Sequence, residues 1–380
     1  MYTKTTINNL LINCVKRPIT QQTLFDIKVL YKKIPDKRKL RDIAISNKVQ
    51  SVVAEALDMA IGFENNLDWW KKGRQETYNR ISNQLAEIDR VGRTLVSRNI
   101  NTILLENGGL ARIVYPNPSL YEFGDFDLMA KSEDINKIHN LLSGLGYRIA
   151  NKSSTSHKID MSNGRIEYIL SDQNANGLRL NVQTRLVARR WFRAVREPNF
   201  DTLFNRSIPI DDSGLRILGK EDFLFQLCIH NAAHGFIRKP GLRLHLDIDW
   251  YVRNSSVNWE DFISIVNRFR TKTLTYFALF IPKLIFSTPI PIEVINSFKP
   301  PEWKDKLISS WLKKSGVLDS NKPKFSKIKY FIFTVVLYDR LIQFLKEISL
   351  IDFLSAKDLP LRHREIRNLF KVPFSDSKFN

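Results

Sequence analysis

Two acidic residues, Asp125 and Asp127, are the strongest candidates for chemistry in this chain. Apolar residues flank them, including Phe126 and Leu128, which predicts a short strand that is entered through Gly124. Side chains at positions i and i+2 of a strand point to the same face, so the two carboxylates would lie side by side. Such a pair is normally tolerated where a cation lies between the charges, and Mg²⁺ binds carboxylate oxygens while leaving room for phosphates. The alternative is an edge strand with two solvated acids.

A second candidate feature precedes the acidic pair. Residues 101–106 predict a strand, Asn107, Gly108 and Gly109 predict a turn, and residues 110–115 have helical spacing. A strand, a glycine turn and a helix start would present free backbone N–H groups to an anionic phosphate. The sequence therefore predicts acids for a metal ion and amides for phosphates in one small unit.

These motifs, taken together and in order, resemble the core of the bacterial uncharacterised nucleotidyltransferases, members of the DNA polymerase β-like superfamily. The resemblance rests on Gly108-Gly109, on Tyr-Pro-Asn-Pro at 115–118, on Gly-Asp-Phe-Asp-Leu at 124–128 and on residues 141–147. A second segment, residues 221–235 followed by Arg243 and Asp247, is similar to the helical part that follows the core in that family. The similarity is close over residues 99–252 and looser in the flanks.

The resemblance implies a metal-dependent nucleotidyltransferase that moves a nucleoside monophosphate from a nucleoside triphosphate to an acceptor hydroxyl. Asp125 and Asp127 would be the catalytic residues and would hold Mg²⁺ or Mn²⁺. The residues expected at the nucleotide are Asn107, Gly108, Gly109 and Gly124. The acceptor stays open, because a small molecule, a saccharide, a protein or RNA would all be compatible with such a site.

Four positions depart from the pattern of the family. The later strand carries Asn181 and Gln183 where the family has an acid and a histidine, Asn107 replaces a lysine, and the basic residue expected near Tyr121 is missing. An amide oxygen coordinates a cation without adding charge, so either Asn181 or Glu167 on the neighbouring strand would complete the metal site. The alternative function is a catalytically weakened protein of the same fold that binds nucleotides or nucleic acid.

Further candidates lie outside the core motifs. Arg189 and Arg190 stand beside aromatic residues, which indicates either a triphosphate or nucleic-acid contact or an amphipathic helix. His230 and His234 share one face of a predicted helix. Because the HExxH arrangement is absent and no cysteine completes a ligand set, structural or substrate-facing histidines are expected rather than metal ligands. Together with Arg243 and Asp247, these histidines complete the set of pocket candidates.

The periodicity of the apolar residues predicts an α+β fold. A small mixed sheet would form a nucleotidyltransferase-like core over residues 99–210, with a helical N-terminal segment over 1–98 and a helical C-terminal domain over 211–380. Residues 69–96 carry apolar residues at helical intervals and predict one long amphipathic helix that leads into the core.

The chain contains 59 Lys and Arg against 39 Asp and Glu, for a net charge of +20, so we expect it to attract polyanions, including nucleoside triphosphates. Its two cysteines, Cys14 and Cys228, lie far apart, which predicts neither a disulfide framework nor a zinc cluster. With no signal-peptide pattern and no apolar run long enough to span a bilayer, the sequence predicts a cytoplasmic protein without a transmembrane segment.

Overall fold

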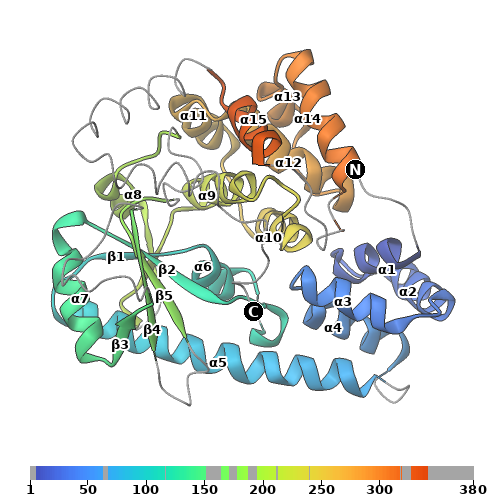
Figure 1. The fold of residues 1–380 in the computed structure, drawn as a ribbon, viewed down its shortest axis with the longest axis horizontal. Helices are drawn as coiled ribbons and strands as arrows, with labels where there is room; N and C mark the ends of the chain where they lie inside the picture. The colour runs from blue at the N-terminus through green and yellow to red at the C-terminus, as the bar shows by residue number, and fades with distance from the viewer. Residues whose placement is uncertain are drawn as a thin grey trace.

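The computed structural model describes residues 6–62, 67–115, 117–150, 164–170, 178–186, 195–210, 213–238, 240–316, 318 and 327–340. Within these ranges one mixed sheet is surrounded by helices, so the predicted α+β fold with helices on both sides of a sheet is confirmed (Figure 1). The strands are β1 (Thr102–Leu105), β2 (Asp125–Ala130), β3 (Tyr147–Ile149), β4 (Arg165–Leu170), β5 (Arg179–Gln183), β6 (Ile208–Pro209) and β7 (Arg216–Ile217).

The order of the strands across the sheet is β3-β4-β5-β2-β1-β7-β6, so β2 lies in the middle. It pairs antiparallel with β1, which places Leu105 opposite Asp127, and parallel with β5, which places Asn181 opposite Asp127. On the next strand, β4, Glu167 lies opposite Asn181. Residues that are paired across a sheet share a face, so this register decides which polar side chains stand beside the acidic pair.

The helices before the sheet are α1 (Thr6–Val15), α2 (Gln21–Lys33), α3 (Lys37–Ser46), α4 (Gln50–Ile61) and α5 (Asp68–Ser97). Helix α5 has 30 residues and is therefore about 45 Å long. It buries Ile81, Ile88 and Leu95 on one face, runs beneath the sheet and reaches the N-terminal helices (Figure 1). The long amphipathic helix predicted over residues 69–96 is thus present.

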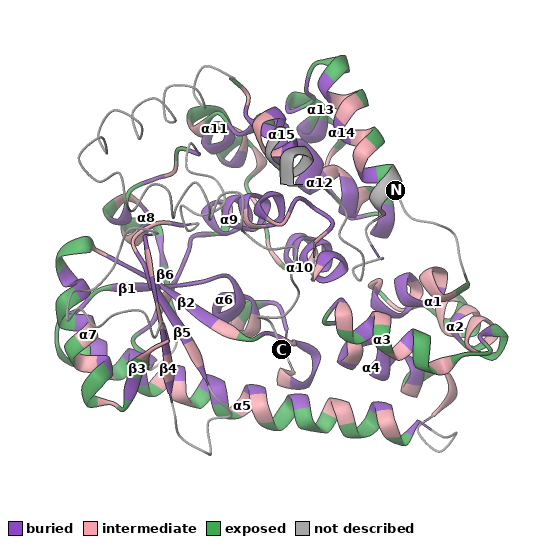
Figure 2. Cartoon of the chain, viewed as in Figure 1, coloured by how far each residue is buried: buried purple, intermediate pink, exposed green. Residues whose placement is uncertain are grey.

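The helices within and after the sheet are α6 (Glu106–Ile113), α7 (Ile135–Gly144), α8 (Phe200–Arg206), α9 (Lys220–Ala233), α10 (Gly241–Asn254), α11 (Trp259–Phe269), α12 (Lys272–Phe286), α13 (Ile292–Ser297), α14 (Glu302–Ser315) and α15 (Lys327–Leu337), with short 3₁₀ turns at Pro118–Leu120 and Ser132–Asp134. Helices α9 and α10 are buried along most of their length (Figure 2). Both contact α6, the helix that directly follows β1, so they pack against this part of the core.

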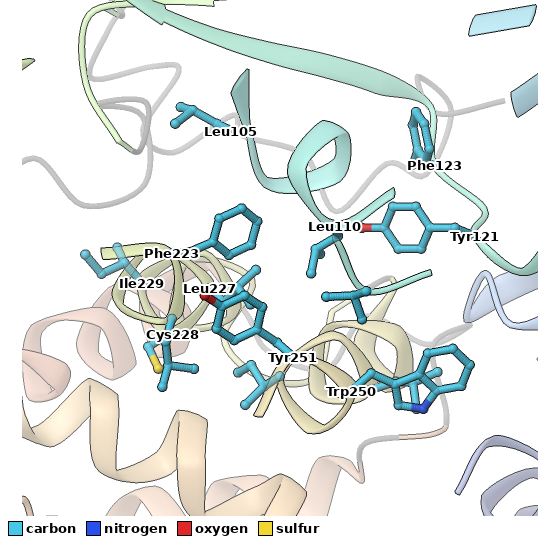
Figure 3. Close-up of a cluster of buried hydrophobic side chains, with 14 of the residues drawn as sticks. Leu105, Leu110, Tyr121, Phe123, Phe223, Leu227, Cys228, Ile229, Trp250 and Tyr251 are labelled. Atoms are coloured by element: carbon cyan, nitrogen blue, oxygen red, sulfur yellow. The ribbon is translucent and has the colours of Figure 1, made fainter. Parts of the chain in front are cut away.

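The glycine turn predicted at Gly108 and Gly109 is wrong, because both residues lie inside α6, which begins at Glu106. The chain turns from β1 into α6 at Glu106, whose φ is +37°. A Cβ atom at Gly108 would come within 2.5 Å of the Leu104 side chain, and one at Gly109 within 2.4 Å of the Phe223 ring. The two glycines therefore allow α6 to pack closely on β1 and on α9, where Phe223 is directed toward α6 (Figure 3).

The sheet also contains strands that the sequence did not predict. Besides β3, the short strands β6 and β7 join it, and β7 pairs parallel with β1 at Leu104 and Ile217. The sheet therefore extends beyond residue 186, where the alternation of apolar residues ends. The division of the chain at residues 98 and 210 stays a prediction.

Throughout the described part of the chain, every helix is too short or too polar to cross a bilayer.

Candidate active site

Asp125 and Asp127 lie on one face of β2, as their spacing along a strand requires. Asp127 is buried, with 7% of its surface exposed, whereas Asp125 is half-buried. Burial raises the pKa of Asp127 well above its usual range, and the charges of Asp125 and Glu106 raise it further. The site therefore concentrates negative charge where water is largely excluded, which is an environment that a cation would stabilise.

Asn181 on β5 reaches the acidic pair across the sheet. Its Nδ2 atom donates a hydrogen bond to Oδ2 of Asp125 over 3.0 Å. The Oδ1 atom of Asn181 is buried and has no hydrogen-bond partner within the described residues. A buried acceptor without a partner is costly, so this oxygen is a candidate ligand for a cation held by the two carboxylates.

Glu167, the other candidate for the third position, does not reach the pair. It lies on β4, two strands away from Asp127, which corresponds to roughly 9–10 Å across the sheet. Its carboxylate instead forms an ion pair with Arg179 at 3.2 Å. Of the two candidates, the geometry places Asn181 beside the carboxylates and leaves Glu167 engaged elsewhere.

Glu106 is a site residue that the sequence analysis missed. It follows Leu105, which is paired with Asp127, and only 7% of its surface is exposed. Its φ of +37° is unusual for a residue with a side chain, and such backbone strain concentrates at functional sites. The signal in the sequence was an acid at the end of a buried strand, directly before Asn107.

His230 forms an ion pair with Glu106 through Nδ1, and its ring stacks on that of His234 with the centroids 4.8 Å apart. Burial lowers the pKa of His230, but the charge of Glu106 and the hydrogen bond to it outweigh this effect, so the pKa is raised overall. The proximity of His230 and His234 on one helix face is thus observed, and His230 is engaged by a carboxylate.

A small pocket lies between α6, α9 and α10, and its lining is rich in polar groups. It is lined by Glu106, Asn107, Leu110, Leu227, His230, Arg243, Leu244 and Asp247. Four of the residues predicted as site or pocket candidates, namely Asn107, His230, Arg243 and Asp247, therefore meet at one place.

Asn107 connects this pocket to the acidic pair. Its Nδ2 atom donates to the backbone oxygen of Asp125 over 3.1 Å and to Oδ1 of Asp125 over 3.3 Å. Its Oδ1 atom accepts hydrogen bonds from Nη2 of Arg243 over 2.5 Å and from the Tyr121 hydroxyl over 3.1 Å. Asn107 therefore orients Asp125 and is itself oriented by a buried cation.

Asp247 binds the side chain of Arg243 and holds it in place. It accepts a hydrogen bond from Nε of Arg243 at 3.2 Å and another from the Tyr115 hydroxyl at 2.7 Å. The Arg243 guanidinium also lies 4.6 Å from the centre of the Tyr121 ring, which stacks on Tyr115. Tyr115 in turn stacks on Trp250 of α10, so Asp247 and an aromatic stack together hold the arginine.

The remaining predicted residues are distributed as follows. Gly124 is exposed at the start of β2, and Gly108 and Gly109 are buried inside α6. Arg189 and Arg190 lie outside the described residues. Among the described residues, no group of three or more His, Cys, Asp or Glu side chains is arranged to hold a metal ion.

The model of the uncharacterised nucleotidyltransferase family matches residues 34–287, which is more than half of the chain. The matched range contains the sheet, the acidic pair and the pocket, and it begins before α3, upstream of the region in which the motifs were recognised. The chain belongs to the uncharacterised nucleotidyltransferase family. No curated protein and no solved structure matches it.

Proposed function

We propose that the protein is a metal-dependent nucleotidyltransferase that transfers a nucleoside monophosphate from a nucleoside triphosphate to an acceptor hydroxyl. The observation that carries the proposal is the position of Asp125 and Asp127 on one face of β2, with the Asn181 amide beside them. Membership of the nucleotidyltransferase family supports the class of reaction.

The donor atoms at this site fit Mg²⁺ or Mn²⁺. Two carboxylates and the unpartnered Oδ1 of Asn181 supply hard oxygen ligands on adjacent strands. Bound there, such an ion would neutralise the triphosphate and lower the pKa of the acceptor hydroxyl. Since the described residues contain no complete set of three acidic, histidine or cysteine ligands, oxygens of the triphosphate would contribute to the coordination.

The chain contributes orientation and charge around these ligands. Asn107 holds both the backbone and the carboxylate of Asp125, and Arg243 holds Asn107. Glu106 adds negative charge near Asp127, and its pairing with His230 keeps that charge partly balanced. The carboxylate of Asp125 is therefore held in a fixed orientation. The two carboxylates stay close together although no opposite charge contacts them directly among the described residues.

Calorimetry of Mg²⁺ with a non-hydrolysable nucleoside triphosphate tests the proposal. We expect binding in the wild type and its loss in Asp125→Asn and Asp127→Asn, because each change removes one of two charges that face the cation. Asp201→Asn is the matched control, since Asp201 is an exposed acid on α8 with a side chain 67% exposed. Equal binding by all four proteins would show that the acidic pair is not a metal site.

A second candidate function is a nucleotide-binding protein of the same fold with weakened transfer. The observation that favours it is Asn181, which donates an amide hydrogen to Asp125 in the place where a third carboxylate is expected. Labelled triphosphates separate the two functions. Transfer of label from the α position supports the nucleotidyltransferase, whereas metal-dependent binding without any transfer supports the binding protein.

The acceptor and the base of the nucleotide are left open by this proposal. A small molecule, a saccharide, a protein and RNA are all acceptors that carry a hydroxyl, and the net charge of +20 favours acidic ones among them.

A further inference from the structure

Three cations from three separate elements converge on the segment that leads into the acidic pair. Arg243 on α10 donates from Nη1 to the backbone oxygen of Glu122, and Arg80 on α5 donates from Nη1 to that of Phe123 over 2.6 Å. The third is Lys48, in the turn between α3 and α4. A Cβ atom built on Gly124 would lie 3.8 Å from its Nζ atom, and no other described residue except the chain neighbours of Gly124 would lie within 4 Å of it.

Of these three cations, Lys48 is the one with a free ammonium within the described part of the chain, where no hydrogen bond or ion pair to its Nζ occurs. Arg243 is buried and donates to Asp247, Asn107, Tyr121 and Glu122. Lys48 and Gly124 are both exposed. The side of Gly124 that faces this ammonium therefore leaves room for a small group, next to the start of the acidic strand.

The turn that carries Lys48 is held firmly on both sides. Oδ1 of Asn47 accepts a hydrogen bond from the backbone N–H of Leu242 over 3.1 Å. The backbone N–H of Ser51 donates to Glu122 over 2.7 Å. Because these bonds tie the turn to α10 and to the segment before β2, the fold holds the backbone from which the Lys48 side chain extends.

The backbone of Lys48 is in the left-handed region, with φ of +50°. This conformation favours glycine, and a lysine that adopts it is a reason to look for a role of its side chain. Protein atoms around the ammonium, together with repulsion by Arg243, lower the pKa of Lys48 to about 8, while Asp125 and Glu122 act in the opposite direction. An anion beside the ammonium would offset the repulsion among the cations.

We propose that Lys48 binds the polyphosphate of the nucleotide, in the space between its ammonium and Gly124. This inference rests on the proposed function, to which it adds Lys48 as a residue that binds the nucleotide. The turn before α4 brings an ammonium to the start of the acidic strand from a distant part of the chain.

Calorimetry with inorganic tripolyphosphate tests this assignment without requiring the base of the nucleotide to be known. We expect Lys48→Met to weaken binding about ten- to a hundredfold, the range for the loss of one charge-assisted hydrogen bond. Lys48→Arg should retain most of the affinity because it keeps the charge. Lys39→Met is the matched control, since Lys39 is an exposed lysine on α3.

Lys48→Gly guards against a folding defect in the methionine variant, because glycine removes the charge and suits the left-handed backbone. The Lys48 effect should persist in EDTA, whereas any effect of Asp125→Asn requires the metal. If the Lys48 variants bind tripolyphosphate as the wild type does, the assignment is overturned and the metal site is unaffected. If the wild type binds neither tripolyphosphate nor a triphosphate with Mg²⁺, the assignment and the proposed function both fail.

Discussion

Asn181 donates its side-chain amide to Asp125 across 3.0 Å, from the strand that runs parallel to the acidic one. The amide hydrogen occupies one of the lone pairs that a metal ion would use. A carboxylate at the same position would instead add a charged ligand, so the identity of this one side chain sets the strength of the candidate metal site.

We expect Asn181→Asp to tighten the binding of Mg²⁺ in the presence of a triphosphate analogue by about tenfold or more, because a third carboxylate would face the cation. Glu167→Gln is the matched control, because Glu167 pairs with Arg179 and should leave the affinity unchanged. Calorimetry of the three proteins measures the effect. A loss of affinity in Glu167→Gln alone would assign the third ligand to Glu167 instead.

Asp127→Asn should make the metal-free protein more stable while it abolishes metal-dependent binding. Burial and the neighbouring charges of Asp125 and Glu106 all disfavour an ionised Asp127. Removing that charge should raise the free energy of unfolding in EDTA by about 0.5–2 kcal/mol, the range that single stabilising substitutions commonly reach. Denaturant unfolding measures it, and an unchanged or lower stability would contradict the inferred repulsion.

Gly109→Ala should destabilise the protein by about 1–3 kcal/mol, because the added methyl group would overlap the Phe223 ring in a packed interior. Gly144→Ala is the matched control, since Gly144 ends α7 and a Cβ atom there would have no neighbour within 4 Å. That change should be neutral or stabilising by about 0.5–1 kcal/mol. Thermal unfolding of the two variants distinguishes a packing role of Gly109 from a role in phosphate binding alone.

The stability of the protein should fall in mild acid because of His245. This residue is fully buried on α10, with Nδ1 at 3.0 Å from the Asn231 amide and Nε2 at 2.8 Å from the Phe236 oxygen. Burial lowers its pKa from 6.5 to about 4. His245 therefore binds a proton more readily in the unfolded chain than in the folded chain. Its contribution to the free energy of unfolding is fully present above pH 6.5 and decreases as the pH falls toward 4.

The expected loss is up to about 3 kcal/mol at the acidic end of that window. His245→Gln should flatten the dependence between these pH values, because glutamine cannot titrate. Urea unfolding at a series of pH values measures both curves. Parallel curves for the wild type and the variant would exclude His245 as the source.

The sequence was sufficient to predict the elements with a long or regular pattern. The apolar stripe of α5 continues for many turns, and the alternation around Asp125 indicates a strand whose two acids must share a face. The predicted turn at Gly108 and Gly109 failed because glycine signals a turn locally. Here Gly109 is required by the Phe223 ring from α9, and that contact arises only in the folded protein.

The residues that the sequence could not reveal are those brought to the site by tertiary structure. Glu106 is placed beside Asp127 by the pairing of β1 with β2, and no local spacing relates the two. Lys48 reaches Gly124 from a turn between helices, in a stretch where it is the only Lys or Arg between Arg41 and Lys71.

The hydrogen bond from Leu242 to Asn47 joins residues 195 positions apart. A ribosome adds about 5–20 residues each second, so this interval corresponds to about 10–40 seconds of synthesis. During that time the turn that carries Lys48 has emerged but lacks the partner that fixes it to α10. The N-terminal helices must therefore remain soluble on a growing chain before they dock, and the side of the site that carries Lys48 is completed only after α10 has been made.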